Sequence, residues 1–368
     1  IKMKINIIRS LVRWYLKGKS LSRAKIEMKD VSNILVMSNT AIGDTLFATP
    51  AINLLRKNYP DKNIIALLSP KNYELFKTNP NIDEIITYRG KWGNFLQVAF
   101  KLRAKNIDLT FIFHSNEPQA TPLAFLSGSK YIIKIPNDKN EFNFLHYNPP
   151  IAPQLDEHFI NRRLKQLSYI GIDEQSYQME IYPLTSWYSE VDQVLKDYVK
   201  YIGIQIGAST ISRMWLVERW IDLTNKILDY DDNLQIILTG SKSEKKLTDY
   251  VQNSIQNSRV LNLAGELDLC SAAVLIDRLD LLITPDTGPL HIAAAMNTPT
   301  IAISVAGNAI ESNPIDDKVS HIFIQKPFTC TPCIDKKCKN QICMEQITVD
   351  EVFSEVVKII QKPIESVF

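Results

Sequence analysis

The chain has 368 residues, of which 45% are hydrophobic and 22% are charged, which is enough for two domains with a core each. Its 42 Lys and Arg nearly balance its 40 Asp and Glu, so it lacks the excess of positive charge that is typical of nucleic-acid-binding proteins. No run of about 18 apolar residues occurs, which argues against a membrane-spanning helix, and we expect a cytoplasmic protein.

The first 32 residues form a basic extension in which Lys and Arg far outnumber the acids. A helix would place four apolar side chains on one face: Ile5, Ile8, Val12 and Leu16. This pattern is typical of a helix that lies on an anionic membrane, here the inner membrane, but a basic helix packed on the protein's own surface fits it equally well. Charges interrupt the apolar positions and no small-residue cleavage site follows, so we do not expect a signal peptide.

Strand-like and helix-like segments then alternate. Apolar runs of strand length cover 33–37, 63–68, 84–88, 108–113 and 130–135. Helical spacing is clearest in 49–59, 92–106 and 158–171. This alternation predicts a parallel sheet with helical crossovers, and a proline-bearing polar region around Pro149 and Pro150 marks the approach to its end. We assign residues 33–190 to this first domain.

Alternation starts again in residues 191–368, which we assign to a second domain. Its expected strands are 201–207, 234–240, 259–265, 280–286 and 298–304. Two Rossmann-like α/β domains are the simplest architecture that fits. In such sheets ligands bind beyond the carboxyl ends of the strands, so the residues that follow the strands are the candidates for function.

The first candidate stretch, "SNTAIGDTLFATPAI", follows the strand at 33–37. Gly43 would let the backbone turn sharply, and Asp44 would come at the start of a helix expected near Thr45. The amino terminus of that helix would face the ligand-binding edge of the sheet. The turn alone is equally consistent with Asp44 as a simple helix cap.

The second candidate stretch, "ITPDTGPLHIAAAMNTPTIAI" at 283–303, places a tight turn and a short Ala-rich helix after a strand. Free backbone amides at the start of the helix, the Thr287 hydroxyl and the His291 ring could converge on a diphosphate there. Considered alone, a histidine such as His291 is more often a buried core residue than a ligand-binding residue.

Together the two stretches resemble the signatures of glycosyltransferase family 9, the ADP-heptose:lipopolysaccharide heptosyltransferases. "IGDTLFATPA" at 42–51 is similar to the family's I-G-D-x-x-x-x-T-P-A, and "DTGPLHIAA" at 286–294 is similar to D-[ST]-G-x-x-H-x-A-A. The resemblance runs from about residue 33 to residue 360. It implies a GT-B type α/β fold, in which two Rossmann-like domains with parallel sheets face a central cleft.

The resemblance also implies roles for individual residues. Asp44 matches the general base that accepts the proton of the acceptor hydroxyl while C1 of the donor sugar inverts, and Thr40 and Gly43 belong to the same acceptor-side turn. The positions that hold the diphosphate and proximal sugar of the donor match Asp286, Thr287, Gly288 and His291.

A third stretch, "IQIGASTISRMWLVERW" at 204–220, resembles the family's K-x-W-P segment. Arg213 stands where the family commonly has lysine, and a cation there would neutralise the leaving diphosphate, so that catalysis requires no metal cofactor.

Glu244 matches the acid that holds the donor's ribose, although helix capping explains it equally well. Ser38 replaces an arginine that is usual in the first motif, which leaves room for an outer-core or different acceptor.

Four of the five cysteines lie in "CTPCIDKKCKNQIC", within residues 330–343. Their spacing suits a structural zinc or iron site with four thiolate ligands: Cys330, Cys333, Cys338 and Cys343. Two disulfides, or four reduced thiols without a metal, remain alternatives.

The resemblance favours an inverting transferase that moves heptose from ADP-heptose to a lipopolysaccharide or lipooligosaccharide core acceptor. Two alternatives stay open. One is a transferase of the same fold with another nucleotide-sugar or a protein acceptor. The other is a GT-B relative that transfers nothing, such as a nucleotide-sugar epimerase or binding protein. No nucleic-acid partner is expected.

Overall fold

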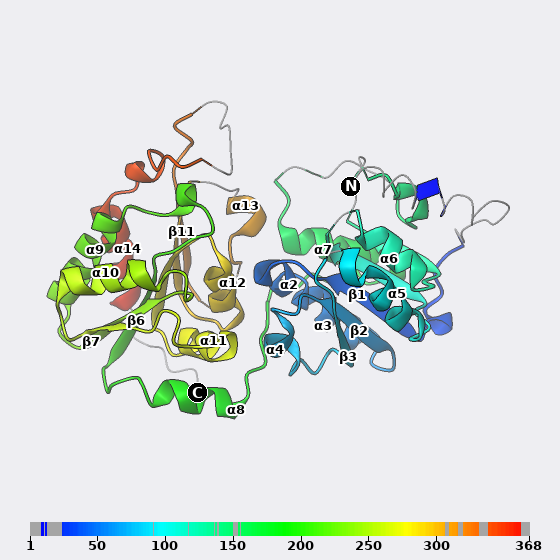
Figure 1. Cartoon of the computed structure of the whole chain (residues 1–368), viewed down its shortest axis with the longest axis horizontal. Coiled ribbons are helices and arrows are strands. Elements are labelled where there is room, and N and C mark those ends of the chain that lie inside the picture. The colour runs from blue at the N-terminus through cyan, green and yellow to red at the C-terminus, as the bar shows by residue number, and fades with distance from the viewer. Residues whose placement is uncertain are drawn as a thin grey trace. The chain divides into compact units, whose positions relative to one another are not determined.

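The computed structural model describes residues 9, 10, 12, 24–90, 92–116, 118–135, 137, 140–149, 154, 156–305, 309–315, 319–330 and 338–361. The chain divides into two compact units, Ile1–Tyr182 and Pro183–Phe368, and each is built on one parallel sheet (Figure 1). The boundary expected between residues 190 and 191 falls inside helix α8, which packs against α11 of the second unit. The bidentate ion pair of Arg278 with Asp192, at 2.9 Å for both bonds, ties α8 to this unit.

The described part of the first unit has a five-stranded sheet in the order β3-β2-β1-β4-β5, with all neighbours parallel. The five strands expected from the sequence are thereby confirmed. The elements are η1 (Met28–Asp30), β1 (Asn33–Ser38), α2 (Ile42–Leu46), α3 (Thr49–Asn58), β2 (Asn63–Leu68), α4 (Tyr73–Phe76), β3 (Glu84–Thr87), η2 (Trp92–Asn94), α5 (Phe95–Arg103), β4 (Leu109–His114), α6 (Ala120–Leu126), β5 (Tyr131–Lys134), η3 (Asn143–Leu145), α7 (Phe159–Leu167) and η4 (Ser168–Ile170), where η denotes a 3₁₀ helix.

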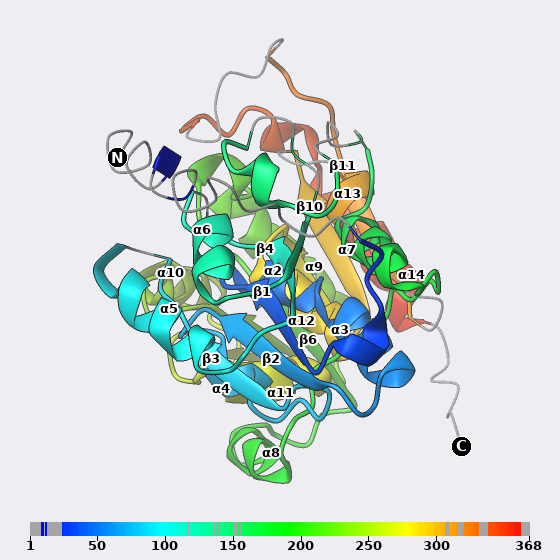
Figure 2. The ribbon, with the colours of Figure 1, turned by 90° about the vertical axis from the view of Figure 1, so that its right-hand side faces the viewer.

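The central strand β1 is buried on both faces, because helices cover both sides of the sheet. Residues 34–37 of β1 have no exposed surface, which explains their unbroken apolar run. Figure 2 shows α5 and α6 on one face of the sheet and α3 and α7 on the other. Leu35 and Met37 pack in one core cluster with Val98 and Leu102 of α5.

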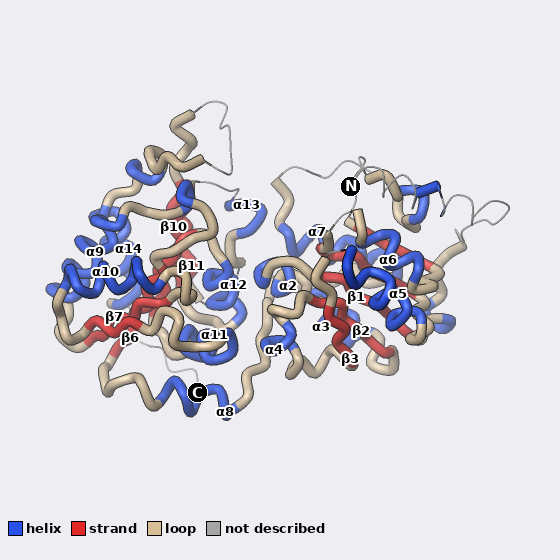
Figure 3. The backbone as a smooth tube through the Cα atoms, in the orientation of Figure 1, coloured by secondary structure: helices blue, strands red, loops and turns tan. Residues whose placement is uncertain are grey.

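The described part of the second unit has a six-stranded parallel sheet in the order β11-β10-β9-β6-β7-β8 (Figure 3). Its elements are α8 (Thr185–Asp192), β6 (Lys200–Gln205), η5 (Ile211–Arg213), α9 (Val217–Tyr230), β7 (Leu234–Thr239), α10 (Lys245–Ile255), β8 (Val260–Asn262), α11 (Leu269–Asp277), β9 (Leu281–Pro285), α12 (Gly288–Ala295), β10 (Thr300–Ser304), α13 (Ala309–Ser312), β11 (His321–Gln325), η6 (Met344–Gln346) and α14 (Val349–Ile360). The sequence did not predict β11, an edge strand that is half-buried over most of its length and carries little of the apolar signal of a central strand.

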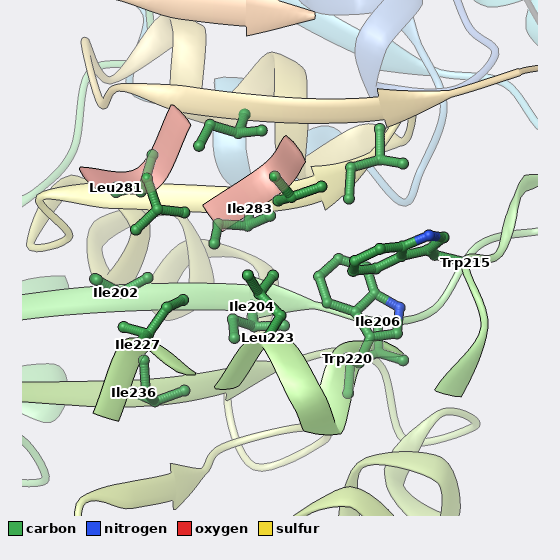
Figure 4. Packing of buried hydrophobic residues seen from close by; sticks show 14 of the residues in the cluster. Ile202, Ile204, Ile206, Trp215, Trp220, Leu223, Ile227, Ile236, Leu281 and Ile283 are labelled. Carbon is green, nitrogen blue, oxygen red and sulfur yellow. The ribbon is translucent and has the colours of Figure 1, made fainter. Parts of the chain in front are cut away.

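The core of the second unit contains two tryptophans (Figure 4). Trp215 and Trp220 are fully buried and meet edge to face, with ring centroids 5.0 Å apart. The Trp215 indole Nε1 donates to the carbonyl of Ile347 at 3.0 Å. This contact fixes the segment between β6 and α9, to which Arg213 belongs.

The basic extension is described only at Arg9, Ser10, Val12 and from residue 24 onwards, so most of the expected helix lies outside the described residues. Val12 is buried against Phe142 and Leu145, and Arg9 Nη1 lies 3.1 Å from a carboxylate oxygen of Glu141. These contacts are with the protein's own first unit. Within the described part of the chain, no helix has the length and apolar character needed to cross a membrane.

Candidate active site

Asp44 lies in the first turn of α2, directly beyond the carboxyl end of β1. The helix begins at Ile42 rather than near Thr45, so Gly43 is a buried helical residue and the sharp turn precedes it. The N-cap residue is Ala41, which has extended backbone and makes no side-chain cap bond. The alternative that Asp44 is only a helix cap is therefore wrong, because the cap position precedes it by three residues and its carboxylate has other partners.

Side chains from distant elements surround the Asp44 carboxylate. Thr40 Oγ1 donates to Asp44 Oδ2 at 2.8 Å, and His114 Nδ1 lies 3.4 Å from the same oxygen. Arg163 Nη2 lies 3.9 Å from Asp44 Oδ1 and donates to the Asp44 backbone carbonyl at 3.3 Å. About a quarter of the Asp44 side chain, 23%, is exposed. A ligand can therefore reach the carboxylate while the contacts with Thr40, His114 and Arg163 hold it in position.

Arg163 and His114 were not singled out from the sequence. Arg163 is almost fully buried on α7, where it donates to the Phe159 carbonyl at 2.6 Å and covers the Phe47 ring. Burial lowers the pKa of Arg163 to about 10, which Asp44 opposes, so the guanidinium is still charged at neutral pH. An arginine on the apolar face of a predicted helix was the signal that could have revealed it.

The motif at 286–291 lies beyond the carboxyl end of β9 in the second unit. Thr287 is the N-cap residue of α12, Gly288 is its first residue, and the Thr287 hydroxyl donates to the Pro285 carbonyl at 3.2 Å. Asp286 and His291 are both buried, with His291 Nε2 4.0 Å from Asp286 Oδ1. The four residues of this motif are thus grouped at the amino terminus of a helix, where the helix dipole favours a bound anion.

Arg213 joins this group from a different segment. It ends the 3₁₀ helix η5, and its Nη1 donates to the Asp286 backbone carbonyl at 3.4 Å. The buried Trp215 two residues later holds the segment in place. The structure therefore brings Arg213 to the amino-terminal end of α12.

Glu244 precedes α10 but makes no cap bond to it. Its Oε2 accepts from the amide and the hydroxyl of Ser241 at 2.7 and 2.6 Å, and its Oε1 accepts from Gln205 Nε2 at 3.3 Å. A Cβ at Gly207 would lie 1.8 Å from Glu244 Oε1, so a larger residue there would displace the carboxylate from this position. The carboxylate lies at the carboxyl ends of β6 and β7, and β6 is also the neighbour of β9, so all the donor-side residues share one edge of the sheet.

The structure describes three of the four clustered cysteines, whereas Cys333 lies outside the described residues. The amide of Thr329 donates to Cys343 Sγ at 3.2 Å, and the amide of Asn340 donates to Cys338 Sγ at 3.3 Å. The Cys338 thiol also donates to the Asn340 carbonyl at 3.6 Å. Among the described residues no three acids, histidines or cysteines form a metal-binding group.

Two parallel α/β units, each with charged residues beyond the carboxyl ends of its strands, define the GT-B class of glycosyltransferases. The sequence model of glycosyltransferase family 9 (heptosyltransferase) matches residues 97–343, so the chain belongs to this family. Lipopolysaccharide core heptosyltransferase OpsX of Haemophilus influenzae is 24% identical over 89% of this chain and 96% of its own length. Lipopolysaccharide heptosyltransferase 3 of Escherichia coli is 25% identical over 86% of this chain and 96% of its own length.

Solved structures share the fold. A family 9 glycosyltransferase from Veillonella parvula superimposes with a TM-score of 0.76 at 19% identity, covering 91% of this chain and 99% of that one. The ADP-heptose lipopolysaccharide heptosyltransferase II of E. coli gives a TM-score of 0.68 at 18% identity, covering 89% and 98%. The iron-containing dodecameric glycosyltransferase TibC of enterotoxigenic E. coli gives a TM-score of 0.57 at 11% identity, covering 91% and 78%.

Proposed function

We propose that the chain transfers heptose from ADP-heptose to a lipopolysaccharide or lipooligosaccharide core acceptor, with inversion at C1 and with Asp44 as the general base. Two relatives that match almost along their whole length are named lipopolysaccharide heptosyltransferases, and the name of one of them specifies the core. The observation that carries the proposal is the Asp44 carboxylate, held at the end of β1 by Thr40 and partly open to ligands. A carboxylate in this position can accept a proton from a bound hydroxyl.

In the proposed reaction the acceptor hydroxyl gives its proton to Asp44 as its oxygen forms a bond to C1 of heptose. The bond between C1 and the diphosphate oxygen breaks on the opposite face, and ADP leaves with the bonding electron pair. The Arg213 cation and the amino terminus of α12 would stabilise the charge that develops on the diphosphate. Such stabilisation supports transfer without a catalytic metal, and Glu244 would hold the ribose of the donor through a carboxylate fixed by Ser241.

An assay of ADP release tests the proposed reaction. We expect ADP to form from ADP-heptose only when a core acceptor is present. A binding protein would release no ADP in either case, and an epimerase would turn over its nucleotide-sugar without any acceptor. A thermal-shift panel of nucleotide-sugars then tests the donor, because a ligand at about 100 times its Kd stabilises the fold by about 2.7 kcal/mol. A larger shift with another nucleotide-sugar, or transfer to a protein acceptor, would contradict the proposed substrates.

We also propose that the cysteine segment holds a structural zinc or iron ion through Cys330, Cys333, Cys338 and Cys343. The amide bonds to the sulfurs of Cys338 and Cys343 support it, and one protein of the same fold is named as containing iron. Elemental analysis of the purified protein should find about one metal per chain. Cys338→Ser should lose that metal, whereas Cys270→Ala, which changes a buried cysteine of α11, should keep it. Equal metal content in both variants would exclude the site.

We also propose a peripheral contact with an anionic membrane from the cytoplasmic side. The sequence suggests the basic extension at 1–32 for this contact, most of which lies outside the described residues, whereas the described residues that support it are on α5. Helix α5 exposes 63% of Leu96 and 71% of Phe100, and residues 89–105 around them carry Lys and Arg but no acid. Sedimentation with anionic vesicles but not with neutral ones is the expected result, and Phe100→Ser should weaken it. Equal sedimentation with both vesicle types would contradict an electrostatic contact.

A further inference from the structure

His114 lies beside Asp44, although neither sequence motif contains it. It is the last residue of β4, which pairs with β1. The register between the two strands shifts after Met37, so that Ser38 pairs with His114 and not with Phe113. An irregularity of this kind re-aims the side chains next to it and is common beside active sites. The shift places the imidazole of His114 against the turn that carries Thr40.

The single hydroxyl proton of Thr40 decides which group donates and which accepts in its two hydrogen bonds, one with Asp44 and one with His114. Thr40 Oγ1 lies 2.8 Å from Asp44 Oδ2 and 2.7 Å from His114 Nδ1. An ionised carboxylate can only accept hydrogen bonds. Thr40 therefore donates its hydroxyl hydrogen to Asp44 whenever Asp44 is in the ionised form in which it can act as a base. The hydroxyl oxygen must then accept from His114, which therefore carries its proton on Nδ1 and a lone pair on Nε2.

Three charged groups act on His114: Asp44, Arg163 and Lys134. The pKa of His114 lies below its ordinary value of 6.5, because partial burial, Arg163 and Lys134 lower it and Asp44 only partly opposes them, although 48% of the side chain is exposed. The ring thus stays neutral at neutral pH and takes up its second proton only below the ordinary histidine range. Once protonated, the ring would carry a positive charge 3.4 Å from the Asp44 carboxylate.

We propose that His114 is a positioning residue for sugar transfer, which fixes the Thr40 hydroxyl and, through it, the orientation of the Asp44 carboxylate. The kinetic consequence rests on the proposed function, whereas the hydrogen-bond order does not. A carboxylate held by one hydroxyl can rotate about its side-chain bonds. A hydroxyl that is itself held by a ring from a neighbouring strand keeps the carboxylate in the orientation that the acceptor needs.

Three variants test the kinetic consequence. His114→Ala should lower kcat by about tenfold to 100-fold with little change in the KM for the donor, since the donor-side residues are untouched. Thr40→Val should have a similar effect, and the double variant should be no slower than the worse single one, because both remove the same chain of hydrogen bonds. His114→Asn places an amide donor where Nδ1 was, so it should restore most of the rate. We also expect the wild type to lose activity on acidification below the ordinary histidine range, where His114 takes up its second proton, and His114→Asn should not show this loss, since an amide does not titrate there.

The chain offers a matched control at the opposite end of a sheet. Thr300 Oγ1 lies 2.9 Å from His321 Nδ1, and both residues are the first of their strands, β10 and β11. His321→Asn should therefore leave the rate and its pH dependence unchanged. A wild-type kcat for His114→Ala, or a double variant that multiplies the two single losses, would overturn the positioning role.

Nitrogen NMR of protein with labelled histidine tests the hydrogen-bond order without any substrate. The chain has five histidines, and the resonance lost in His114→Asn identifies His114. We expect its neutral form to carry the proton on Nδ1, and we expect Thr40→Val to relax this preference. A proton on Nε2 would overturn the inference. If the wild type shows the expected tautomer but transfers no heptose, the proposed function fails and the hydrogen-bond order around Asp44 stands. If it transfers heptose but shows the other tautomer, the proposed function stands and the hydrogen-bond order fails.

Discussion

Asp44 in the first unit and Glu244 in the second are both carboxylates at the carboxyl end of a parallel strand, but they are held in different ways. Glu244 accepts three hydrogen bonds, two of them from Ser241, three residues before it. Within the described part of the chain, the Asp44 carboxylate accepts one short hydrogen bond, from Thr40, and its other neighbours come from β4 and α7. A carboxylate has about four acceptor positions, so Glu244 is held rigidly and keeps about one position for a ribose hydroxyl, whereas Asp44 keeps more positions open for a proton. We expect substitutions in the second unit to act on donor binding and leaving-group stabilisation, and those around Asp44 to act on turnover.

Arg213 should give the largest effect on the donor side. Arg213→Ala should lower kcat/KM for ADP-heptose by about 100-fold, because it removes a cation that contacts the Asp286 turn. Arg213→Lys keeps the charge but not the planar fork, and it should recover part of the loss. Steady-state kinetics with varied donor checks this. An alanine variant as active as the lysine variant would show that charge at this position is not used.

Trp215 should matter for the placement of Arg213 and for stability. Trp215→Phe leaves a cavity in the core and removes the indole donor, although Arg219 still donates to the same Ile347 carbonyl. We expect the free energy of unfolding to fall by about 1–3 kcal/mol, and donor affinity to fall as well. Urea titration and donor binding measure the two effects. Trp187→Phe, at a half-buried position of α8, is the control and should cost less.

Glu244 should give a smaller effect, confined to binding. Glu244→Gln keeps the shape and weakens the acceptor bonds from Ser241, so the Kd for ADP-heptose should rise by about tenfold while kcat changes little. Isothermal titration with ADP-heptose and with ADP gives the comparison. A fall in kcat at saturating donor without a change in Kd would show that Glu244, like Asp44, acts on turnover and not on donor binding.

Asp280 should give the smallest effect, through pH. Burial raises the pKa of Asp280, against the opposing effects of its bond from the Tyr201 amide and of Lys200. A carboxyl group with a raised folded-state pKa destabilises the fold above that pKa, and this cost disappears as the pH falls towards its ordinary value of 3.8. Asp280→Asn should therefore be at least as stable as the wild type at pH 7 and lose that advantage near pH 4. The urea midpoints of the variant and the wild type at both pH values test this. If the variant became more stable relative to the wild type on acidification, the raised pKa of Asp280 would be contradicted.

The sequence predicted the central elements well, because fully buried parallel strands such as β1 and β2 are unbroken apolar runs. It missed β11, because most residues of this edge strand are only half-buried and the strand therefore lacks an unbroken apolar run. It placed the helix after β1 three residues too late, since Ala41 rather than Asp44 occupies the N-cap position.

The candidate site was predictable where it is local. Asp286, Thr287, Gly288 and His291 lie within six residues and one motif, and the structure groups them. Arg163 is 119 residues away from Asp44, and His114 reaches Thr40 only through a shift in strand register. Neither the burial of an arginine nor an irregularity between two strands is encoded in a local pattern, so these neighbours of Asp44 emerged only from the fold.

The most direct test of the account is Asp44→Asn, which keeps the size of the side chain and removes its capacity to take a proton. Turnover of ADP-heptose with a core acceptor should fall by at least about 100-fold, while the Kd for ADP-heptose should stay within about threefold of the wild type. An asparagine variant that turns over at the wild-type rate would contradict the assignment of Asp44 as the base.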